Sequence, residues 1–239
     1  MKAYAATDVG IKRSVNQDYV YSSLEPVGKL PNLFIVADGM GGHKAGDVAS
    51  RYTVENFVKQ VKESKDSDII SVINDAIVKV NDGLYKLACS HEDYEGMGTT
   101  LVAATIIDGV LKVANVGDSR LYIVDDDICQ ITRDHSYVEE LVSSGKINRN
   151  QAREHENKNV ITRAVGACDE VEAEMFSVEV TKGSKIVMCS DGLTNMVEDA
   201  DIMRLVKEFD DLQDCCQELI RLANDNGGRD NISVVIIEP

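Results

Sequence analysis

Two apolar segments separated by only two residues place the strongest constraint on how this chain can fold. The segments TTLVAATII (99–107) and VLKVANV (110–116) are joined by Asp108-Gly109, a pair typical of the tight turn between antiparallel strands. RLYIV and ICQIT repeat the arrangement around the acidic turn 125–127. Further strand signals occur at EAEMFSVEV, KIVMCS and ISVVIIE. The pattern predicts antiparallel sheets built from consecutive hairpins.

Helix signals lie in separate runs of the sequence. Amphipathic spacing predicts helices at about 47–62 and 67–87, and two more within 199–226. Asp47 is the expected N-cap of the first helix. A short helix is predicted from Ser136, with a capping box between Ser136 and Glu139 and a stop at Gly145. Since strands and helices occupy separate runs, the pattern favours an α+β fold over a doubly wound α/β fold.

The length and the absence of linkers favour one domain. The chain has 239 residues, only three prolines and no low-complexity segment, which suits a single domain over 1–239. The polar stretch after the short helix is expected to form an exposed flap insertion, at about 136–160 overall. The six cysteines lack CxxC spacing, which argues against a structural zinc site.

Charge and hydropathy exclude several classes of function. The 41 acidic residues against 25 basic ones give a net charge of −16, which repels nucleic-acid backbones. No apolar run is long enough to span a bilayer, and the N-terminus lacks the apolar stretch of a signal peptide. We therefore expect a cytoplasmic protein with reduced thiols, no nucleic-acid partner, no membrane insertion and a monomeric state.

Five aspartates lie where apolar strand segments begin or end. They are Asp18, Asp38, Asp118, Asp191 and Asp230. Five carboxylates gathered at one edge of a core would repel one another unless cations intervene. Such oxygen ligands suit Mg²⁺ or Mn²⁺, and the glycine at position 39 leaves its backbone carbonyl accessible as a further ligand. Any single Asp-Gly pair is weak evidence, because Asp-Gly is also a common turn.

Arg13 supplies the complementary charge. A guanidinium can bind a phosphate dianion through two parallel hydrogen bonds. Most arginines are instead solvated surface residues, so Arg13 gains its meaning only beside the aspartates.

Eight short motifs together resemble the PPM family, the PP2C-type metal-dependent protein serine/threonine phosphatases, in its short bacterial form. They are RSVNQD (13–18), VADGMGGH (36–43), GTT (98–100), GDSR (117–120), DHS (134–136), ITRAVG (161–166), SDGL (190–193) and GGRDNIS (227–233). They occur in the family's order and cover nearly the whole chain. The resemblance implies a four-layer α-β-β-α sandwich, with two antiparallel sheets flanked by helices.

The same resemblance implies the roles of most site residues. Asp38 matches the carboxylate that bridges two metals, and Asp191 and Asp230 match ligands of the first metal. The Gly39 carbonyl matches a ligand of the second metal, with Asp18 nearby through water.

Further matches concern the phosphate and a looser ion. Asp118, together with Asp191, matches the pair that can hold a third, weaker ion in bacterial members. Arg13 matches the phosphate-binding arginine, and 136–160 corresponds to the variable flap beside the active site.

Two positions depart from the pattern of animal members. Those members carry a Glu metal ligand where this chain has Gln17, whereas bacterial members commonly share the Gln. They also have a His, proposed as the general acid, where Met40 stands here. His43 could substitute, but a metal-bound water could equally donate the proton. His91, His135 and His155 carry no catalytic argument, and His135 is expected to support structure near the flap.

The implied reaction is hydrolysis of phosphoserine and phosphothreonine on proteins. Two Mn²⁺ or Mg²⁺ ions would lower the pKa of a bridging water from about 15.7 towards about 7, and the hydroxide would attack phosphorus in line. By analogy, the enzyme would oppose a bacterial Hanks-type Ser/Thr kinase and act on that kinase and its targets.

The sequence leaves three alternatives to a protein phosphatase of this kind. A two-metal nuclease is disfavoured by the acidic charge, and a non-catalytic regulatory domain by the intact set of aspartates with Arg13. A sporulation-type or stress-signalling phosphatase with its own sensor domain would need additional sequence.

Overall fold

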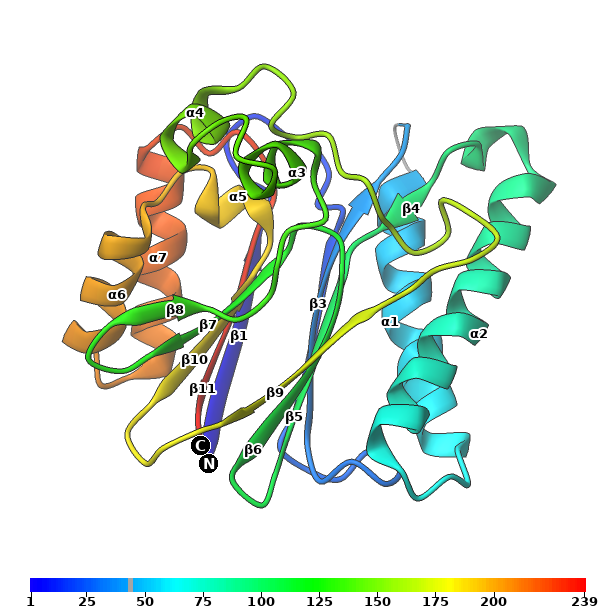
Figure 1. Cartoon of the computed structure of the whole chain (residues 1–239), viewed down its shortest axis with the longest axis horizontal. Coiled ribbons are helices and arrows are strands. Elements are labelled where there is room, and N and C mark those ends of the chain that lie inside the picture. Colours follow the sequence, from blue (N-terminus) through cyan, green and yellow to red (C-terminus); the bar gives the residue numbers. More distant parts are fainter. Residues whose placement is uncertain (43–44) are drawn as a thin grey trace.

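The computed structural model describes residues 1–42 and 45–239 and places two antiparallel sheets face to face between layers of helices (Figure 1). The first sheet has the order β1 (Lys2–Asp8), β11 (Ile232–Glu238), β10 (Lys185–Cys189), β7 (Arg120–Val124) and β8 (Ile128–Gln130). The second has the order β2 (Asp18–Ser23), β3 (Leu33–Met40), β5 (Leu101–Ile107), β6 (Val110–Val116) and β9 (Glu174–Glu179), and β4 (Gly98–Thr99) also pairs with β3.

Helices cover the outer face of each sheet. α1 (Ala45–Glu63) and α2 (Ile69–Ser90) pack on the second sheet, and α6 (Asp199–Glu208) and α7 (Leu212–Asp225) pack on the first (Figure 1). The 3₁₀ turn η1 (Glu92–Tyr94) follows α2, while α3 (Tyr137–Ser143), α4 (Arg149–Glu154) and α5 (Asp191–Thr194) lie together at one end of the sandwich (Figure 1). The predicted four-layer α+β sandwich is confirmed.

Three buried clusters fill the spaces between these layers. Strand β3 shows the arrangement: Phe34 and Val36 face the core between the sheets, whereas Leu33 and Ile35 face α1 and α2. A strand that is buried on both faces requires an unbroken apolar run rather than alternation, which explains the sequence LFIVA.

The hairpin between β5 and β6 forms as its sequence predicts. Ile107 pairs with Val110 across the turn, and Asp108 and Gly109 have φ of 50° and 77°. Positive φ at both central residues belongs to the turn whose twist matches that of antiparallel strands. This local chemistry sets the register of the whole pair, as far as Leu101 opposite Val116.

Several local expectations need correction. The Asp47 N-cap is wrong, because α1 already begins at Ala45 and places Asp47 in its first turn. Strand β1 and helix α4 were not predicted. Ser136 caps α3 as expected, accepting from the Glu139 N–H at 3.3 Å. The second half of the capping box is not seen among the described residues, where the Glu139 carboxylate accepts from Arg149 instead.

Two other sequence expectations concern thiols and membranes. All six cysteines lie within the described residues and are free thiols. Among the helices that the structure describes, none combines the length and hydropathy that crossing a bilayer requires.

Candidate functional site

The aspartates predicted from the sequence converge where the two sheets meet. A pocket of about 240 Å³ is lined by Arg13, Asp38, Gly39, Asp118, Asp191 and Asp230, among others. Asp18 lies beside this pocket, since Asp18 on β2 pairs directly with Asp38 on β3. The fold therefore brings together all six predicted metal-site residues and the predicted phosphate-binding arginine.

Threonines of the GTT motif hold the Asp38-Gly39 backbone in place. The Asp38 N–H donates to Thr100 Oγ1 at 2.9 Å, and the Asp38 carbonyl accepts from the Thr100 N–H at 2.9 Å and from Thr99 Oγ1 at 2.8 Å. Thr100 Oγ1 also lies 2.7 Å from Ser119 Oγ, next to Asp118. These threonines were not singled out in the sequence, although they lie within one of its eight motifs.

Gly39 occupies a position that only glycine fits. A Cβ there would lie 2.0 Å from the carbonyl oxygen of Gly46 and 2.6 Å from that of Gln17. Both neighbours are backbone atoms, which cannot rotate away. The close approach of α1 to the end of β3 therefore depends on the missing side chain.

Replacing Gly39 with alanine is expected to destabilise the protein by about 1–3 kcal/mol, because overpacking forces the backbone to shift. Gly42→Ala is the matched control: Gly42 lies just after the end of β3, and nothing lies within 4 Å of a Cβ there. Urea unfolding of both variants measures the effect. Equal midpoints for the two variants would show that α1 relaxes without cost.

Asp191 is held by residues that follow α5 and precede β11. Its Oδ2 accepts from Asn195 Nδ2 at 2.8 Å. A Cβ on Gly192 would lie 1.9 Å from the Asn231 carbonyl oxygen. The first turn of α5 is therefore pressed against the residue that follows Asp230, which brings two predicted ligands of one metal together.

Asp18 carries a buried oxygen without a partner. The residue is 5% exposed, and its Oδ2 accepts from Ser190 Oγ at 2.7 Å. Its Oδ1 has no hydrogen-bond partner among the described residues. Burial, together with the nearby Asp191 and Asp230, raises the pKa of Asp18 to about 7, although hydrogen bonds from Ser190 and Ser233 oppose the shift. A buried oxygen of this kind lacks the compensation that buried polar groups normally have.

The other carboxyls of the cluster are perturbed in the same direction. Burial, followed by the charges of neighbouring aspartates, raises the pKa of Asp38 and Asp118 well above the usual value. Burial, followed by the charge of Asp230, also raises the pKa of Asp191. Without cations the cluster therefore retains protons near neutral pH. A divalent cation would replace them, and the donor set consists of oxygens, as Mg²⁺ and Mn²⁺ prefer.

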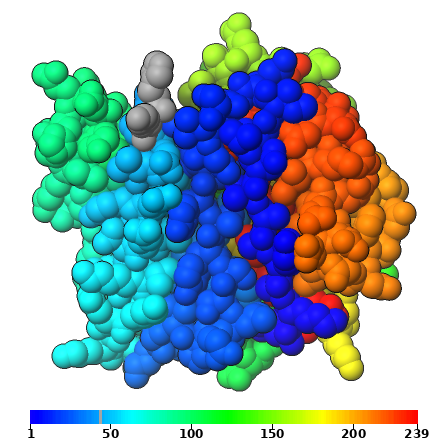
Figure 2. All heavy atoms as spheres, turned by 180° about the vertical axis from the view of Figure 1, so that it is seen from behind, coloured from blue at the N-terminus to red at the C-terminus, as the bar shows by residue number. Residues whose placement is uncertain are grey.

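Arg13 reaches the same pocket from the loop between β1 and β2. One guanidinium nitrogen lies 2.8 Å from Asp230 Oδ2, and about half of the Arg13 side chain is exposed. The loop is fixed by Asn231, which bonds to Val9 O, Val15 O and Gln17 N. Figure 2 shows this N-terminal segment in dark blue, lying against the red C-terminal part of the chain.

Asp118 is positioned from the base of the flap. The Gly117 backbone N–H donates to His135 Nδ1 at 3.1 Å, and the backbone N–H of His135 donates to Gly117 O at 2.9 Å. Asn115 Nδ2 adds bonds to Gly117 O and Arg133 O. Burial and Arg163 lower the pKa of His135, which favours the neutral ring that accepts from Gly117. These bonds agree with the supporting role expected of His135.

The identity of the general acid and the arrangement of the carboxylates around a metal ion stay predictions. His43 lies outside the described residues, whereas Met40 lines the pocket. In the part of the chain that the structure describes, no three Asp, Glu, His or Cys side chains are already arranged to hold an ion.

The chain is similar to known phosphatases in both sequence and structure. The model of a family described as protein phosphatase 2C matches residues 11–227. Serine/threonine phosphatase stp of Listeria innocua is 40% identical, over 100% of this chain and 96% of the relative. The structure of the S. agalactiae serine/threonine phosphatase has a TM-score of 0.91 and 38% identity, and 98% of each chain is covered. The catalytic domain of the serine/threonine protein phosphatase PstP, solved with two manganese ions, has a TM-score of 0.86 and 32% identity, covering 98% of this chain and 96% of that domain.

Proposed function

The chain belongs to the protein phosphatase 2C family and is a serine/threonine protein phosphatase, and we propose that its clustered aspartates hold two divalent cations at the reaction centre. The observation that carries this proposal is the partnerless, buried Oδ1 of Asp18, beside three carboxyls whose pKa values burial and mutual repulsion raise. The two manganese ions of the similar PstP structure support the same assignment.

The proposed ligands are distributed over the ends of five strands. We assign Asp38 as the bridging carboxylate, Asp191 and Asp230 to one ion, and the Gly39 carbonyl to the other, with Asp18 acting through water. A third, weaker ion would lie between Asp118 and Asp191. Manganese is our first choice over magnesium because of the ions in PstP.

The protein's own contribution is to bind and orient the phosphate. When bound, the two cations would lower the pKa of a shared water and draw charge from the phosphoryl oxygens. Arg13 lies at the mouth of the pocket, where its guanidinium can hold two phosphoryl oxygens at once. Its bond to Asp230 holds it next to a ligand of the first ion. The GTT threonines keep Asp38 in position, so little reorganisation is needed on binding.

The substrates are phosphorylated proteins, and we propose that they include a Hanks-type Ser/Thr kinase and its targets. The six free thiols support a cytoplasmic setting for this activity. The net charge of −16 and the family assignment both disfavour the nuclease alternative.

The test is hydrolysis of a phosphothreonine peptide by protein treated with EDTA and then supplied with Mn²⁺ or Mg²⁺. We expect no turnover after EDTA and recovery with added metal, with Mn²⁺ more effective. Turnover that persists in EDTA would contradict the two-cation proposal. A folded protein without turnover in either metal would instead favour a non-catalytic regulatory domain.

A further inference from the structure

A second pocket of about 280 Å³ lies beside the catalytic pocket and has no role in the mechanism above. The two pockets share Asp118 and Asp191 as lining residues. The rest of its lining comes from the flap, from α5 and the residue after it, from the start of β7, the end of β8 and the start of α6, and from Asp134. From the flap come three cationic side chains, Arg149, Arg153 and Lys158.

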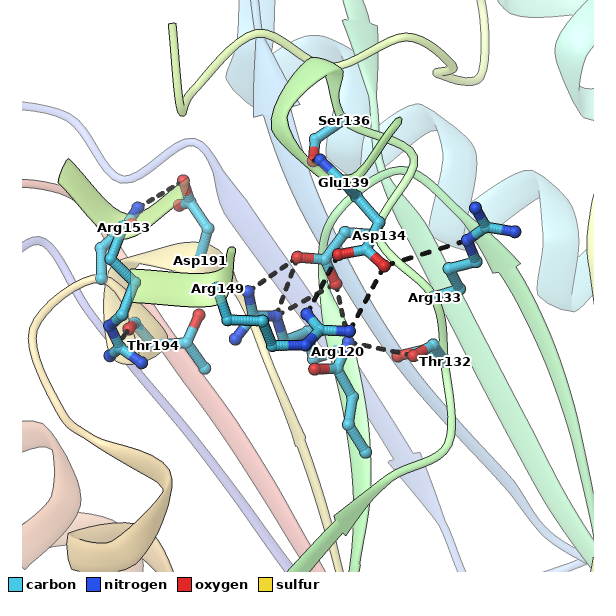
Figure 3. A network of polar contacts seen from close by, with 12 residues as sticks. Arg120, Thr132, Arg133, Asp134, Ser136, Glu139, Arg149, Arg153, Asp191 and Thr194 are labelled. Carbon is cyan, nitrogen blue, oxygen red and sulfur yellow. Dashed lines mark hydrogen bonds and ion pairs between the residues drawn. The ribbon is translucent and has the colours of Figure 1, made fainter. Parts of the chain in front are cut away.

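Most charges around this pocket are already paired (Figure 3). Arg120 lies 2.7 Å from Asp134, and Arg149 bonds to both carboxylate oxygens of Glu139. Arg153 donates to the Thr194 carbonyl at 3.2 Å and also lies 3.0 Å from Glu198. These contacts tie the flap to itself and to α5.

Lys158 differs from the other three cations. Among the residues that the structure describes, no carboxylate lies within 4.0 Å of its ammonium group. It is partly buried in the pocket wall rather than extended into solvent. A half-buried lysine in a pocket wall is a strong candidate for pairing with an anion brought by a ligand.

The charges that line this pocket come close to balancing, unlike those of the protein as a whole. The lining contains four basic residues (Arg120, Arg149, Arg153 and Lys158) and five acidic ones (Asp118, Asp134, Glu139, Asp191 and Asp199). The cations of the proposed function would neutralise Asp118 and Asp191, which leaves four basic residues against three acidic ones. In a chain of net charge −16, this is a place where an anion meets little repulsion.

We propose that this pocket binds an acidic group of the substrate protein, a carboxylate or a second phosphate, one or two residues from the phosphoresidue, with Lys158 as its principal contact. The inference rests on the proposed function, because the phosphoresidue must occupy the neighbouring pocket. Because Asp118 and Asp191 line both pockets, the two pockets adjoin. An extended chain advances about 3.3–3.6 Å per residue, so the acidic group is expected close to the phosphoresidue in the substrate sequence. The pocket would thus select substrates with clustered negative charge.

The test compares phosphothreonine peptides that differ only at positions two before and two after the phosphoresidue. One peptide carries alanine there, one carries aspartate, and one carries a non-hydrolysable phosphonate analogue of phosphoserine. The variants are Lys158→Met and, as a matched control, Lys146→Met, which removes the same charge from an exposed flap position outside the pocket. Turnover of p-nitrophenyl phosphate with Mn²⁺ serves as the reference activity.

We expect Lys158→Met to raise KM for the acidic peptides about five- to tenfold, with kcat and the KM of the alanine peptide unchanged. Lys146→Met should change none of these values. The peptide whose KM rises more in Lys158→Met, either the aspartate or the phosphonate peptide, identifies the acidic group that the pocket prefers.

Two results would overturn the inference alone. The first is that the wild-type protein has equal KM values for all three peptides. The second is that Lys158→Met and Lys146→Met raise KM equally, which would indicate only long-range attraction between the flap and the acidic peptide. If the wild-type protein does not turn over p-nitrophenyl phosphate with Mn²⁺, the proposed function fails, and this inference fails with it.

Discussion

Replacing Asp38 with asparagine is expected to lower metal-dependent turnover by at least about a thousandfold, which corresponds to about 4 kcal/mol of transition-state stabilisation. Asp38 is assigned as the carboxylate shared by both cations, and a neutral amide cannot supply that charge. The backbone bonds of Asp38 to Thr99 and Thr100 do not involve the side chain, so the loop should remain intact.

The same substitution should make the metal-free protein harder to unfold. Asp38 is buried and surrounded by the charges of neighbouring aspartates, of which Asp18 and Asp191 raise its pKa most. Removing one buried acid from this group relieves repulsion and desolvation. A variant that is inactive yet more stable in EDTA would distinguish loss of chemistry from loss of fold.

The measurements are phosphopeptide turnover with Mn²⁺ and thermal unfolding in EDTA. Asp108→Asn is the matched control, because it removes one negative charge from the turn between β5 and β6, where asparagine also tolerates the positive φ. The control should leave turnover unchanged. A folded Asp38→Asn protein with near wild-type turnover would contradict the assignment of the bridging carboxylate.

Raising the pH is expected to destabilise the metal-free protein between about pH 4 and pH 7, and bound Mn²⁺ to remove most of this dependence. In the unfolded chain, Asp18 ionises near a pKa of about 3.9, whereas in the folded protein its pKa is about 7. Between these values the folded state holds a proton that the unfolded state has released. Asp18 therefore lowers the free energy of unfolding by about 1.4 kcal/mol per pH unit.

Other groups modify this slope. The raised pKa values of Asp38, Asp118 and Asp191 act in the same direction as that of Asp18. His135 acts in the opposite direction, because its lowered pKa makes the folded state bind its proton less readily, so its contribution grows as the pH rises. Four carboxyls against one imidazole leave a net loss of stability with rising pH.

Urea unfolding at several pH values, with EDTA or with Mn²⁺, measures this dependence. Asp18→Asn should flatten the curve in EDTA, since the variant has no carboxyl at that position to titrate. A metal-free protein whose stability rises steadily from pH 5 to pH 7 would show that the carboxyls are not perturbed as the geometry implies.

Local chemistry explains which parts of this fold could be predicted. The β5–β6 hairpin follows from Asp108-Gly109 because a two-residue turn specifies its own register. The strand β3 follows from its unbroken apolar run. By contrast, β1 was missed, because its partner β11 lies at the other end of the chain and pairs Ala5 with Val235. Helix α4 was missed because its residues are polar, and its capping box involves Asn148 and Gln151.

The sequence by itself determined the kinds of element, the family resemblance and the set of aspartates, because turn pairs, periodicity and short motifs are properties of neighbouring residues. Only the tertiary structure decided what those aspartates do to one another. The bond from Ser190 to Asp18 joins residues that lie 172 positions apart, and the partnerless oxygen of Asp18 exists only because packing removes it from water. The position of Lys158 was likewise decided only by the tertiary structure. Its partial burial beside the catalytic pocket depends on how the flap packs near α5, and no pattern of neighbouring residues in the sequence indicates it.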